Sequence, residues 1–281
     1  MNDLPGLIIN GIFGKLYGVV RYICDTFRIS GHLVGNILNN AFDIMGLLFE
    51  KLNDDIRFIE GITACINCGT CTAICPAAEV YNYQPRAIAE IVQSRDEEAL
   101  RELLAGDTIW YCGECMSCKT RCPRQNAPGM IIQALRGLSI ETGLFVESEK
   151  GRQQFAIKRL VGESILETGY CVHFDHINTD LFPEQGPLWD WEKAHAEKIL
   201  PKVGANYRGE GPGALRKVSQ EDLDELKNIF EVTGGLEWFR KIEEHSARKA
   251  KEMGMESGTG KDSEYFSYVF TKNDKARHSK K

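Results

Sequence analysis

The sequence lacks the features that mark several large classes of protein. It has no basic excess: 34 Lys and Arg stand against 40 Asp and Glu, a formal charge of −6. A chain of this charge has no electrostatic attraction for a phosphate backbone, so we expect no nucleic-acid partner. It also lacks the G-x-G-x-x-G and G-x-x-x-x-G-K-S/T loops that bind dinucleotides and nucleoside triphosphates. Residues 209–213 (GEGPG) look similar, but Pro212 breaks the pattern, which predicts a turn.

No secretory signal opens the chain, and no run of about 18 charge-free apolar residues is long enough for a spanning helix. Residues 1–50 instead carry apolar side chains at helical spacing, which predicts two amphipathic helices hinged near Ser30 and Gly31. These helices would lie on a membrane surface or pack against a partner protein. Their large apolar face with few charges favours peripheral attachment. We therefore expect a cytoplasmic protein, attached peripherally to the inner face of the cell membrane.

Eight of the ten cysteines lie in two short runs, and this grouping predicts metal binding rather than disulfides in a reducing cytosol. Each run has the spacing C-x2-C-x2-C-x3-C-P, which is that of the two-cluster ferredoxins. The first run is Cys65, Cys68, Cys71 and Cys75, followed by Pro76, and the second is Cys112, Cys115, Cys118 and Cys122, followed by Pro123. The pattern predicts two 4Fe–4S clusters.

In this pattern the fourth cysteine of each run ligates the other cluster. We therefore expect the metal ligands Cys65, Cys68, Cys71 and Cys122 for cluster 1, and Cys112, Cys115, Cys118 and Cys75 for cluster 2. Such an exchange would hold the two runs together and the clusters close. The alternative is a pair of structural zinc sites, but these usually arrive as separated C-x-x-C pairs rather than triples.

The remaining sequence predicts helices and loops. Apolar residues at helical spacing predict one helical segment from Pro85 to Gly106 and another that begins at Pro128. A further helix is predicted beyond residue 146, ending at Glu167. A Gly/Pro-rich passage from Pro183 to Gly213 predicts an extended loop. Ser219 predicts a cap for a helix through Phe230, a charged helix spans Leu236–Lys251, and the final 27 residues are predicted to be loosely ordered. The expected fold class is all-α.

The two runs, with the CINCGTC stretch at Cys65–Cys71 and the Trp110-Tyr111-Cys112 lead into the second, resemble the C subunit of heterodisulfide reductase. That family has a helical ferredoxin domain, and the long insert from Pro76 to Tyr111 suits it. The terminal extensions are more similar to the C subunit of the heterodisulfide-reductase-like complex of sulfur oxidisers. The resemblance implies three regions: 1–50 for membrane or partner binding, 51–145 as the helical ferredoxin domain, and 146–281 as a partner-binding extension.

The resemblance also implies a function. Proteins of this family relay single electrons between a catalytic, cysteine-rich B subunit and an A subunit that carries flavin and iron–sulfur clusters. The chain lacks the adjacent cysteine pair typical of the B subunit, so we expect no substrate site, no catalytic residue and no cofactor besides the clusters. Two alternatives remain: an iron–sulfur subunit of a quinone-linked respiratory dehydrogenase, and a non-redox scaffold that tethers an assembly to the membrane.

Three further groups of residues invite interpretation. Glu114, Lys119 and Arg121 lie in the second run and Arg124 just beyond it. Positive charge favours the reduced cluster, so the cluster of that run is predicted to have the higher potential; alternatively, these side chains face solvent or a partner and are screened. Trp110 and Tyr111 are predicted to pack over a cluster and exclude water. The segment with Cys171, His173, Asp175 and His176 contains metal-binding residue types, but one short segment rarely supplies a full ligand set, which favours a structural role.

Overall fold

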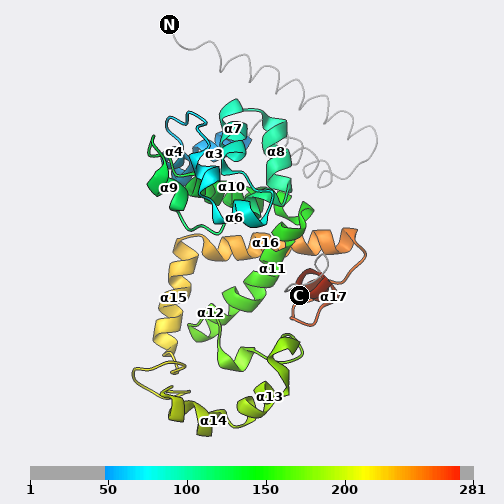
Figure 1. Cartoon of the computed structure of the whole chain (residues 1–281). Helices are drawn as coiled ribbons and strands as arrows, with labels where there is room; N and C mark the ends of the chain where they lie inside the picture. Colours follow the sequence, from blue (N-terminus) through cyan, green and yellow to red (C-terminus); the bar gives the residue numbers. More distant parts are fainter. Residues whose placement is uncertain (1–47, 273–281) are drawn as a thin grey trace, which may run out of the picture. The chain divides into compact units, whose positions relative to one another are not determined.

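A computed structural model of the protein describes residues 48–272 (Figure 1). These residues form helices and turns and contain no β-strand, which confirms the all-α fold class. The chain divides into two compact units, residues 1–55 and 56–281. The first contributes α3 (Leu48–Asn53) to the described residues, and the helices predicted for residues 1–47 lie outside them. No helix within residues 48–272 combines the length and apolar character needed to cross a membrane.

The cysteine-bearing part of the second unit is built around helix α10. Its elements are α4 (Ile56–Gly61), α5 (Thr70–Ala73), α6 (Pro76–Val80), α7 (Pro85–Ser94), α8 (Glu97–Ala105), η1 (Thr108–Tyr111), α9 (Ser117–Arg121) and α10 (Pro128–Thr142). Helix α10 packs against α4, α7, α8 and α9, and it buries most of its length. The core between these helices contains Ile88, Val92, Leu100, Leu104, Ile109, Ile131, Ile132 and Leu135. Pro128 and Pro85 each begin a helix, as predicted.

The helical segment predicted from Pro85 to Gly106 is two helices rather than one. Arg95 ends α7 in the left-handed region at φ 56°. The Asp96 carboxylate then accepts hydrogen bonds from the backbone N–H groups of Glu98 and Ala99 and so caps α8. The periodic apolar residues continue across this break, which is why periodicity alone did not reveal it.

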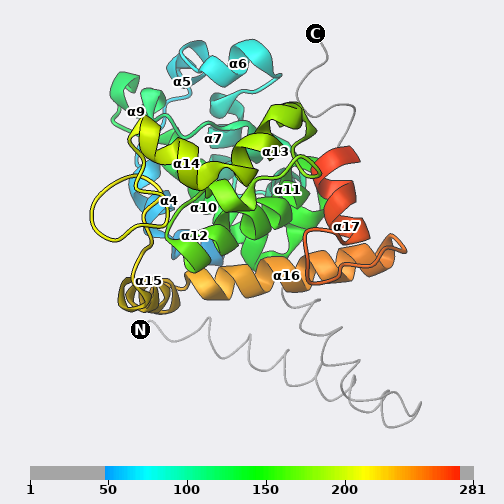
Figure 2. The same cartoon turned by 90° about the horizontal axis from the view of Figure 1, so that it is seen from below.

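Beyond α10 the chain continues into a second group of helices without leaving the unit. They are η2 (Leu144–Glu147), α11 (Glu149–Ile157), the π-helical segment η3 (Lys158–Gly162), α12 (Glu163–Thr168), α15 (Gln220–Val232) and α16 (Gly235–Glu252). Figure 2 shows the long helix α16 passing along α10, α11 and α12, and it packs against α10, α11 and α15. The predicted helices ending near Glu167 and beginning after Ser219 and near Leu236 are confirmed, and Ser219 Oγ caps α15.

The Gly/Pro-rich passage is not an extended loop throughout. It contains η4 (Phe174–His176), η5 (Pro183–Gln185), α13 (Gly186–Ala194), α14 (Ala196–Ile199) and η6 (Leu200–Val203). Trp189 of α13 packs on Phe174 with ring centroids 4.8 Å apart, a contact between residues that local sequence rules do not connect. The turn predicted at residues 209–213 is confirmed, since the Asn206 amide donates to the carbonyls of Glu210 and Pro212.

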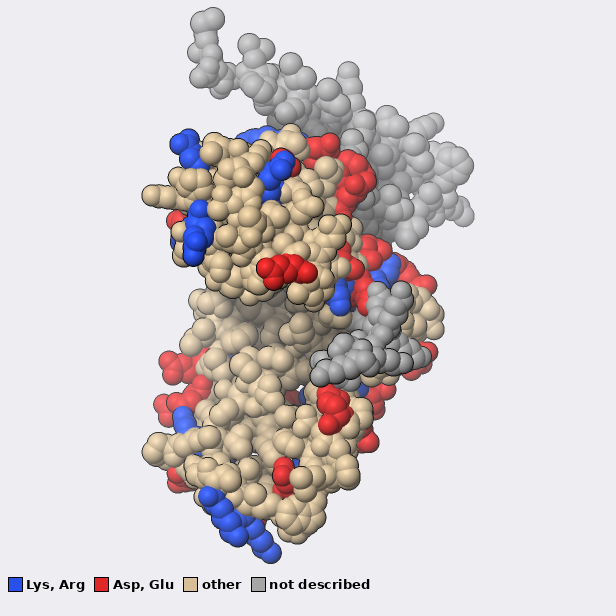
Figure 3. Space-filling model, in the orientation of Figure 1, with Lys and Arg blue, Asp and Glu red and all other residues tan. Residues whose placement is uncertain are grey.

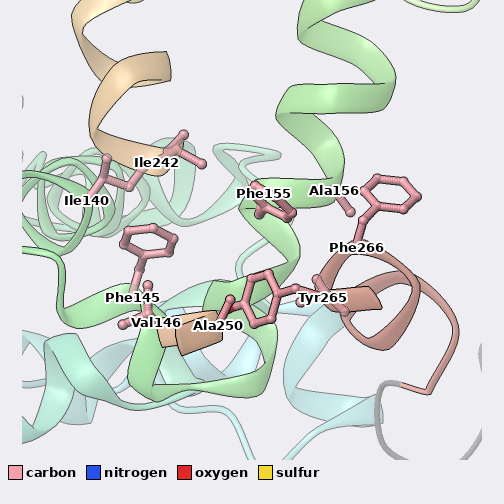
Figure 4. Close-up of a cluster of buried hydrophobic side chains, with 10 residues drawn as sticks. Ile140, Phe145, Val146, Phe155, Ala156, Ile242, Ala250, Tyr265 and Phe266 are labelled. Atoms are coloured by element: carbon pink, nitrogen blue, oxygen red, sulfur yellow. The ribbon is translucent and has the colours of Figure 1, made fainter. Parts of the chain in front are cut away.

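The end of the described chain contradicts the prediction of a loosely ordered tail. Helix α17 (Glu264–Ser267) and the π-helical segment η7 (Tyr268–Lys272) bury Tyr265, Phe266 and Val269 in a core with α11 and α16 (Figure 4). Phe155 of α11 lies 5.4 Å from Tyr265, measured between ring centroids. The polar residues of 255–264 obscured this apolar segment, because it is too short to show periodicity.

A buried arginine connects the π-helical segment to this core. Arg159, 2% exposed, donates through Nη2 and Nε to the Glu243 carboxylate at 2.8 and 3.0 Å, and to the carbonyls of Gly258 and Gly260. A buried guanidinium needs such partners, because an unpaired one costs several kcal/mol. Arg159 therefore fixes the loop before α17 against α16.

Candidate iron–sulfur site

The two cysteine runs have the same local backbone. In the first, Asn67 and Gly69 adopt φ values of 53° and 81°, and in the second, Glu114 and Met116 at the equivalent positions adopt 53° and 57°. A short helix follows the second left-handed residue of each run: α5 follows Gly69, and α9 follows Met116. Equal spacing thus produces equal geometry, although only one of these four positions is a glycine.

The second cysteine of each run is exposed and hydrogen-bonded to a hydroxyl two residues later. Cys68 Sγ lies 3.3 Å from Thr70 Oγ1, and Cys115 Sγ lies 3.4 Å from Ser117 Oγ. These hydroxyls lower the pKa of Cys68 and of Cys115 from the ordinary value of a thiol. A lower pKa favours the thiolate, which is the form that ligates metal.

Four thiols from both runs line one cavity. Its volume is about 150 Å³, and its walls include Cys112, Cys115 and Cys118 of the second run together with Cys75, the last cysteine of the first. The other fourth cysteine, Cys122, is absent from these walls. The donor set of this cavity is thus four cysteine sulfurs, which is what a 4Fe–4S cluster requires.

The first three cysteines of the first run lie next to the second run. Helix α5, which carries Cys71, packs against α9, which carries Cys118, and Figure 2 shows both at the same end of the unit. Burial, with smaller contributions from Cys118 and Cys65, raises the pKa of Cys71. The thiols of the two runs are therefore close enough to interact electrostatically.

Helix α10 begins at the four-thiol cavity. The Gly129 backbone N–H donates to Cys118 Sγ at 3.3 Å. A Cβ atom at Gly129 would lie 2.9 Å from Met116 Sδ and 3.6 Å from Cys118 Sγ, so a larger side chain would project among the cavity walls. Both observations fit a cluster bound here: the amide supports a thiolate, and the glycine leaves the cavity open.

A stacked pair of tyrosines lies near the cavity, and only one of the two lines it. Tyr111 lines it, and Tyr81 stacks on Tyr111 with centroids 4.5 Å apart. Trp110 does not line it; its ring lies 5.4 Å from the Arg136 guanidinium and packs toward the core of α11 and α16. The predicted covering role therefore fits Tyr111 and not Trp110, because consecutive residues of the 3-10 turn point in different directions.

Arg136 of α10 anchors the beginning of the second run. Its guanidinium donates to the carbonyl oxygens of Ile109 at 2.8 Å and Cys112 at 2.7 Å, and pairs with Glu114. At the first run the Gln93 amide donates to the Cys65 carbonyl at 3.0 Å, Arg124 Nε donates to the Ala64 carbonyl at 3.4 Å, and Asn126 Oδ1 accepts from the Thr63 N–H at 2.8 Å. Sequence analysis did not single out these residues as supports of the runs.

The polar groups of the segment from Cys171 to His176 hold loops together. The Asp175 carboxylate accepts from Tyr207 Oη at 2.5 Å and pairs with Arg208 at 2.7 Å, while His176 Nδ1 lies 3.0 Å from Ser164 Oγ. Among residues 48–272, no three His, Cys, Asp or Glu side chains are grouped so as to hold a single metal ion. These contacts account for Asp175 and His176 as structural residues.

Comparison with known proteins agrees with this geometry. Residues 61–126 match a family model described as a 4Fe-4S dicluster domain. The chain is 41% identical over 192 residues to the C subunit of the ferredoxin:CoB-CoM heterodisulfide reductase of Methanosarcina acetivorans, an alignment covering 68% of this chain and 70% of that protein. The chain belongs to the family of heterodisulfide reductase C subunits.

Two other members of the family show how far the similarity extends. The C subunit of the H(2):CoB-CoM heterodisulfide,ferredoxin reductase of Methanothermobacter marburgensis is 29% identical over 195 residues, which is 66% of this chain and 87% of that protein. The C 2 iron–sulfur subunit of the CoB–CoM heterodisulfide reductase of Methanocaldococcus jannaschii is 37% identical over 108 residues, 38% of this chain and 53% of that protein.

Family and domain together confirm the predicted cofactor and general role. The protein is an iron–sulfur subunit that carries two 4Fe–4S clusters and transfers electrons within an oxidoreductase of the heterodisulfide reductase type. Such a role implies other subunits in the same complex.

Proposed function

We propose that Cys75, Cys112, Cys115 and Cys118 bind one cluster and that Cys65, Cys68, Cys71 and Cys122 bind the other. Through these clusters the protein would relay single electrons between a cysteine-rich, catalytic B subunit and an A subunit with flavin and iron–sulfur clusters. The observation that carries the proposal is the cavity into which Cys75 of the first run projects beside three cysteines of the second. By the equivalence of the runs, Cys122 completes the other set.

The surroundings of the thiols suit electron transfer rather than substrate chemistry. Each bound cluster would accept and release one electron. The chain itself holds the thiolates, supports Cys118 with the Gly129 N–H, and keeps water from the cavity with Tyr111. Cys68 and Cys115 are exposed, so a partner has access to one thiol of each set.

Serine substitutions test the exchange of the fourth cysteines. Cys75→Ser should alter the same EPR signal of the dithionite-reduced protein as Cys115→Ser, because both would ligate one cluster. Cys122→Ser should alter the same signal as Cys68→Ser. If Cys75→Ser instead groups with Cys68→Ser, each run binds its own cluster and the assignment is wrong. Iron and acid-labile sulfide analysis of the anaerobic wild-type chain accompanies this test, and zinc in their place would leave only a scaffold.

The partners are tested by affinity purification of the whole chain under anaerobic conditions. Recovery of A-type and B-type subunits in the purified complex, with reoxidation of the dithionite-reduced clusters by a disulfide or sulfur substrate, would support the relay. Both substrate classes are included because the resemblance of the terminal extensions to the complex of sulfur oxidisers rests on the sequence alone. A quinone reductase among the partners would support the respiratory alternative instead.

We also propose that residues 1–50 attach the protein peripherally to the inner face of the cell membrane. The support is the sequence alone, an apolar pattern at helical spacing with few charges. In a flotation experiment with vesicles of neutral and anionic lipid, the full chain should float and a chain lacking residues 1–47 should not. If both stay in solution and the shortened chain loses its protein partners, the segment is an interface within the complex.

A further inference from the structure

Two buried hydrogen-bond donors near the cysteine runs have no oxygen or nitrogen acceptor within residues 48–272. Tyr83 is 1% exposed and Asn126 is 3% exposed; the Asn126 Nδ2 has no hydrogen-bond partner there, and the group that interacts with the Tyr83 hydroxyl is the thiol of Cys112. Most buried polar atoms are bonded, and leaving one unbonded costs about 1–3 kcal/mol. Among the described residues, the best acceptor for Tyr83 is therefore a sulfur of the site, and Asn126 Nδ2 has none.

The two residues occupy equivalent positions after the two runs. Tyr83 lies two residues before Pro85, which begins α7 behind the first run, and Asn126 lies two residues before Pro128, which begins α10 behind the second. Each residue thus immediately precedes the helix that begins behind its run, although helix α6 (Pro76–Val80) intervenes only after the first run. An equivalent position suggests an equivalent role toward each cluster.

Tyr83 faces the cavity of the four thiols. It lines that cavity with Cys75, Cys112 and Cys118, and its ring meets Tyr111 edge-on at a centroid distance of 6.4 Å. The Tyr83 hydroxyl interacts with the thiol of Cys112. A phenol carries its proton at neutral pH, so Tyr83 is available as a donor to sulfur.

Asn126 is oriented by the residues that precede the first run. Its Oδ1 accepts from the backbone N–H groups of Thr63 at 2.8 Å and Ala64 at 3.3 Å. Backbone N–H groups only donate, so the oxygen must face them and Nδ2 must face away. The unpartnered donor thus belongs to a residue fixed next to Cys65.

We propose that Tyr83 donates through Oη to a sulfur of the cluster bound by Cys75, Cys112, Cys115 and Cys118, and that Asn126 donates through Nδ2 to a sulfur of the other cluster. This inference rests on the proposed ligand sets. Reduction adds negative charge to the sulfurs, and a hydrogen bond to a charged acceptor is stronger. Each donor therefore stabilises the reduced state of its cluster and raises its potential.

Tyr83→Phe tests the first donor, because it removes Oη and keeps the ring. In an EPR-monitored redox titration of the anaerobic full chain, one of the two reduction steps should become about tenfold less favourable, which is 59 mV for one electron. The other step should not move. Tyr81→Phe is the matched control, since that exposed tyrosine stacks on Tyr111 and should leave both steps unchanged.

Asn126→Asp tests the second donor, because it keeps the oxygen that binds Thr63 and Ala64 and replaces Nδ2. In the same redox titration, the larger shift in potential should then occur in the other reduction step, the one that Tyr83→Phe does not change. If the Tyr83→Phe protein fails to bind clusters, 3-fluorotyrosine at position 83 replaces it in the test. This residue keeps the shape of tyrosine but is a stronger hydrogen-bond donor, so reduction of the cluster near position 83 should become more favourable.

The inference fails if Tyr83→Phe or the fluorinated variant retains about eight irons, as two 4Fe–4S clusters require, and both steps remain where they are in the wild type. The ligand sets fail separately, by the grouping of the serine variants. If Tyr83→Phe shifts a potential but the serine variants group differently from the proposed sets, Tyr83 donates to a cluster whose ligands are not those proposed.

Discussion

The two cysteine runs share their spacing and backbone but differ in what supports them. Each has left-handed residues at its third and fifth positions and a hydroxyl beside its second cysteine. Around the first run the supporting groups are the amides of Gln93 and Asn126 and the Arg124 side chain, whereas the partly buried Arg136, with bonds to two carbonyls, supports the second. The comparison shows that ligand spacing determines the local geometry, while distant residues determine the environment of each set.

The charges near the runs also differ from what linear sequence indicates. Arg124 follows the second run in sequence, but its Nε donates to the carbonyl of Ala64, just before Cys65. Arg86 of α7 lies beside Gly69 and acts electrostatically with Cys71 of the first run. The first run therefore has two arginines beside it, and neither is next to it in the sequence. The predicted order of the two potentials remains a prediction.

The largest expected difference between the runs concerns the residue after the helix-initiating proline. Gly129 follows Pro128 and leaves the four-thiol cavity open, whereas Arg86 follows Pro85 at the equivalent position. Gly129→Leu should fill the cavity and exclude one cluster, lowering the iron content from about eight to about four per chain. Iron and labile sulfide analysis after anaerobic purification measures this.

Two variants sharpen that experiment. Gly129→Ala should retain both clusters, because the Met116 Sδ that its Cβ would meet belongs to a flexible side chain. Arg86→Leu should also retain both, since Arg86 is exposed and outside the cavity walls. Full iron content in Gly129→Leu would mean that the cavity is not where a cluster binds.

Much of the fold follows from local sequence. Proline at a first helical position, apolar periodicity and the Ser219 cap locate α7, α10 and α15. The wrong predictions for the Gly/Pro-rich passage and for the C-terminal segment have a common cause. The packing of Trp189 on Phe174 and of Tyr265 on Phe155 joins residues far apart in the chain, and local rules contain no information on such contacts.

The residues of the candidate site also fall into two groups, those that local sequence predicts and those that it does not. The cysteines could be predicted because a cluster requires thiolates at fixed spacing. Tyr83, Asn126 and Arg136 could not, because nothing in their immediate neighbours marks them. One pattern was available in the sequence: Tyr83 and Asn126 each lie two residues before a proline that follows a cysteine run. Aligning the two segments on the helix-initiating prolines, Pro85 and Pro128, rather than on the cysteines, would have revealed it.

A smaller difference is expected between the anchors of the two runs. Arg136→Met removes the donors to the Ile109 and Cys112 carbonyls and leaves Glu114 without this partner. Because the guanidinium is largely buried and its bonds are charge-assisted, the loss should be about 3 kcal/mol. Gln93→Ala removes one exposed bond to the Cys65 carbonyl and should cost about 1 kcal/mol or less.

The midpoint of urea-induced cluster loss, followed anaerobically by visible absorbance, compares these two variants. Arg136→Lys is the matched control, because it keeps the charge but lacks the planar fork, so it should fall between Arg136→Met and the wild type. Equal midpoints for Arg136→Met and Gln93→Ala would remove the proposed contrast between a charged and a neutral anchor.

The smallest effect should come from the exposed cations of the second run. Figure 3 shows the basic side chains on one face as separate groups rather than a continuous patch, and Lys119 and Arg121 are both exposed. Water and salt screen such charges, so replacing both by Gln should change the equilibrium for reducing either cluster by about twofold or less. The change should vanish in 1 M salt, where the Debye length is about 3 Å. A larger shift that persists at high salt would show that these cations act through a low-dielectric path, and would support the higher potential predicted for the cluster of the second run.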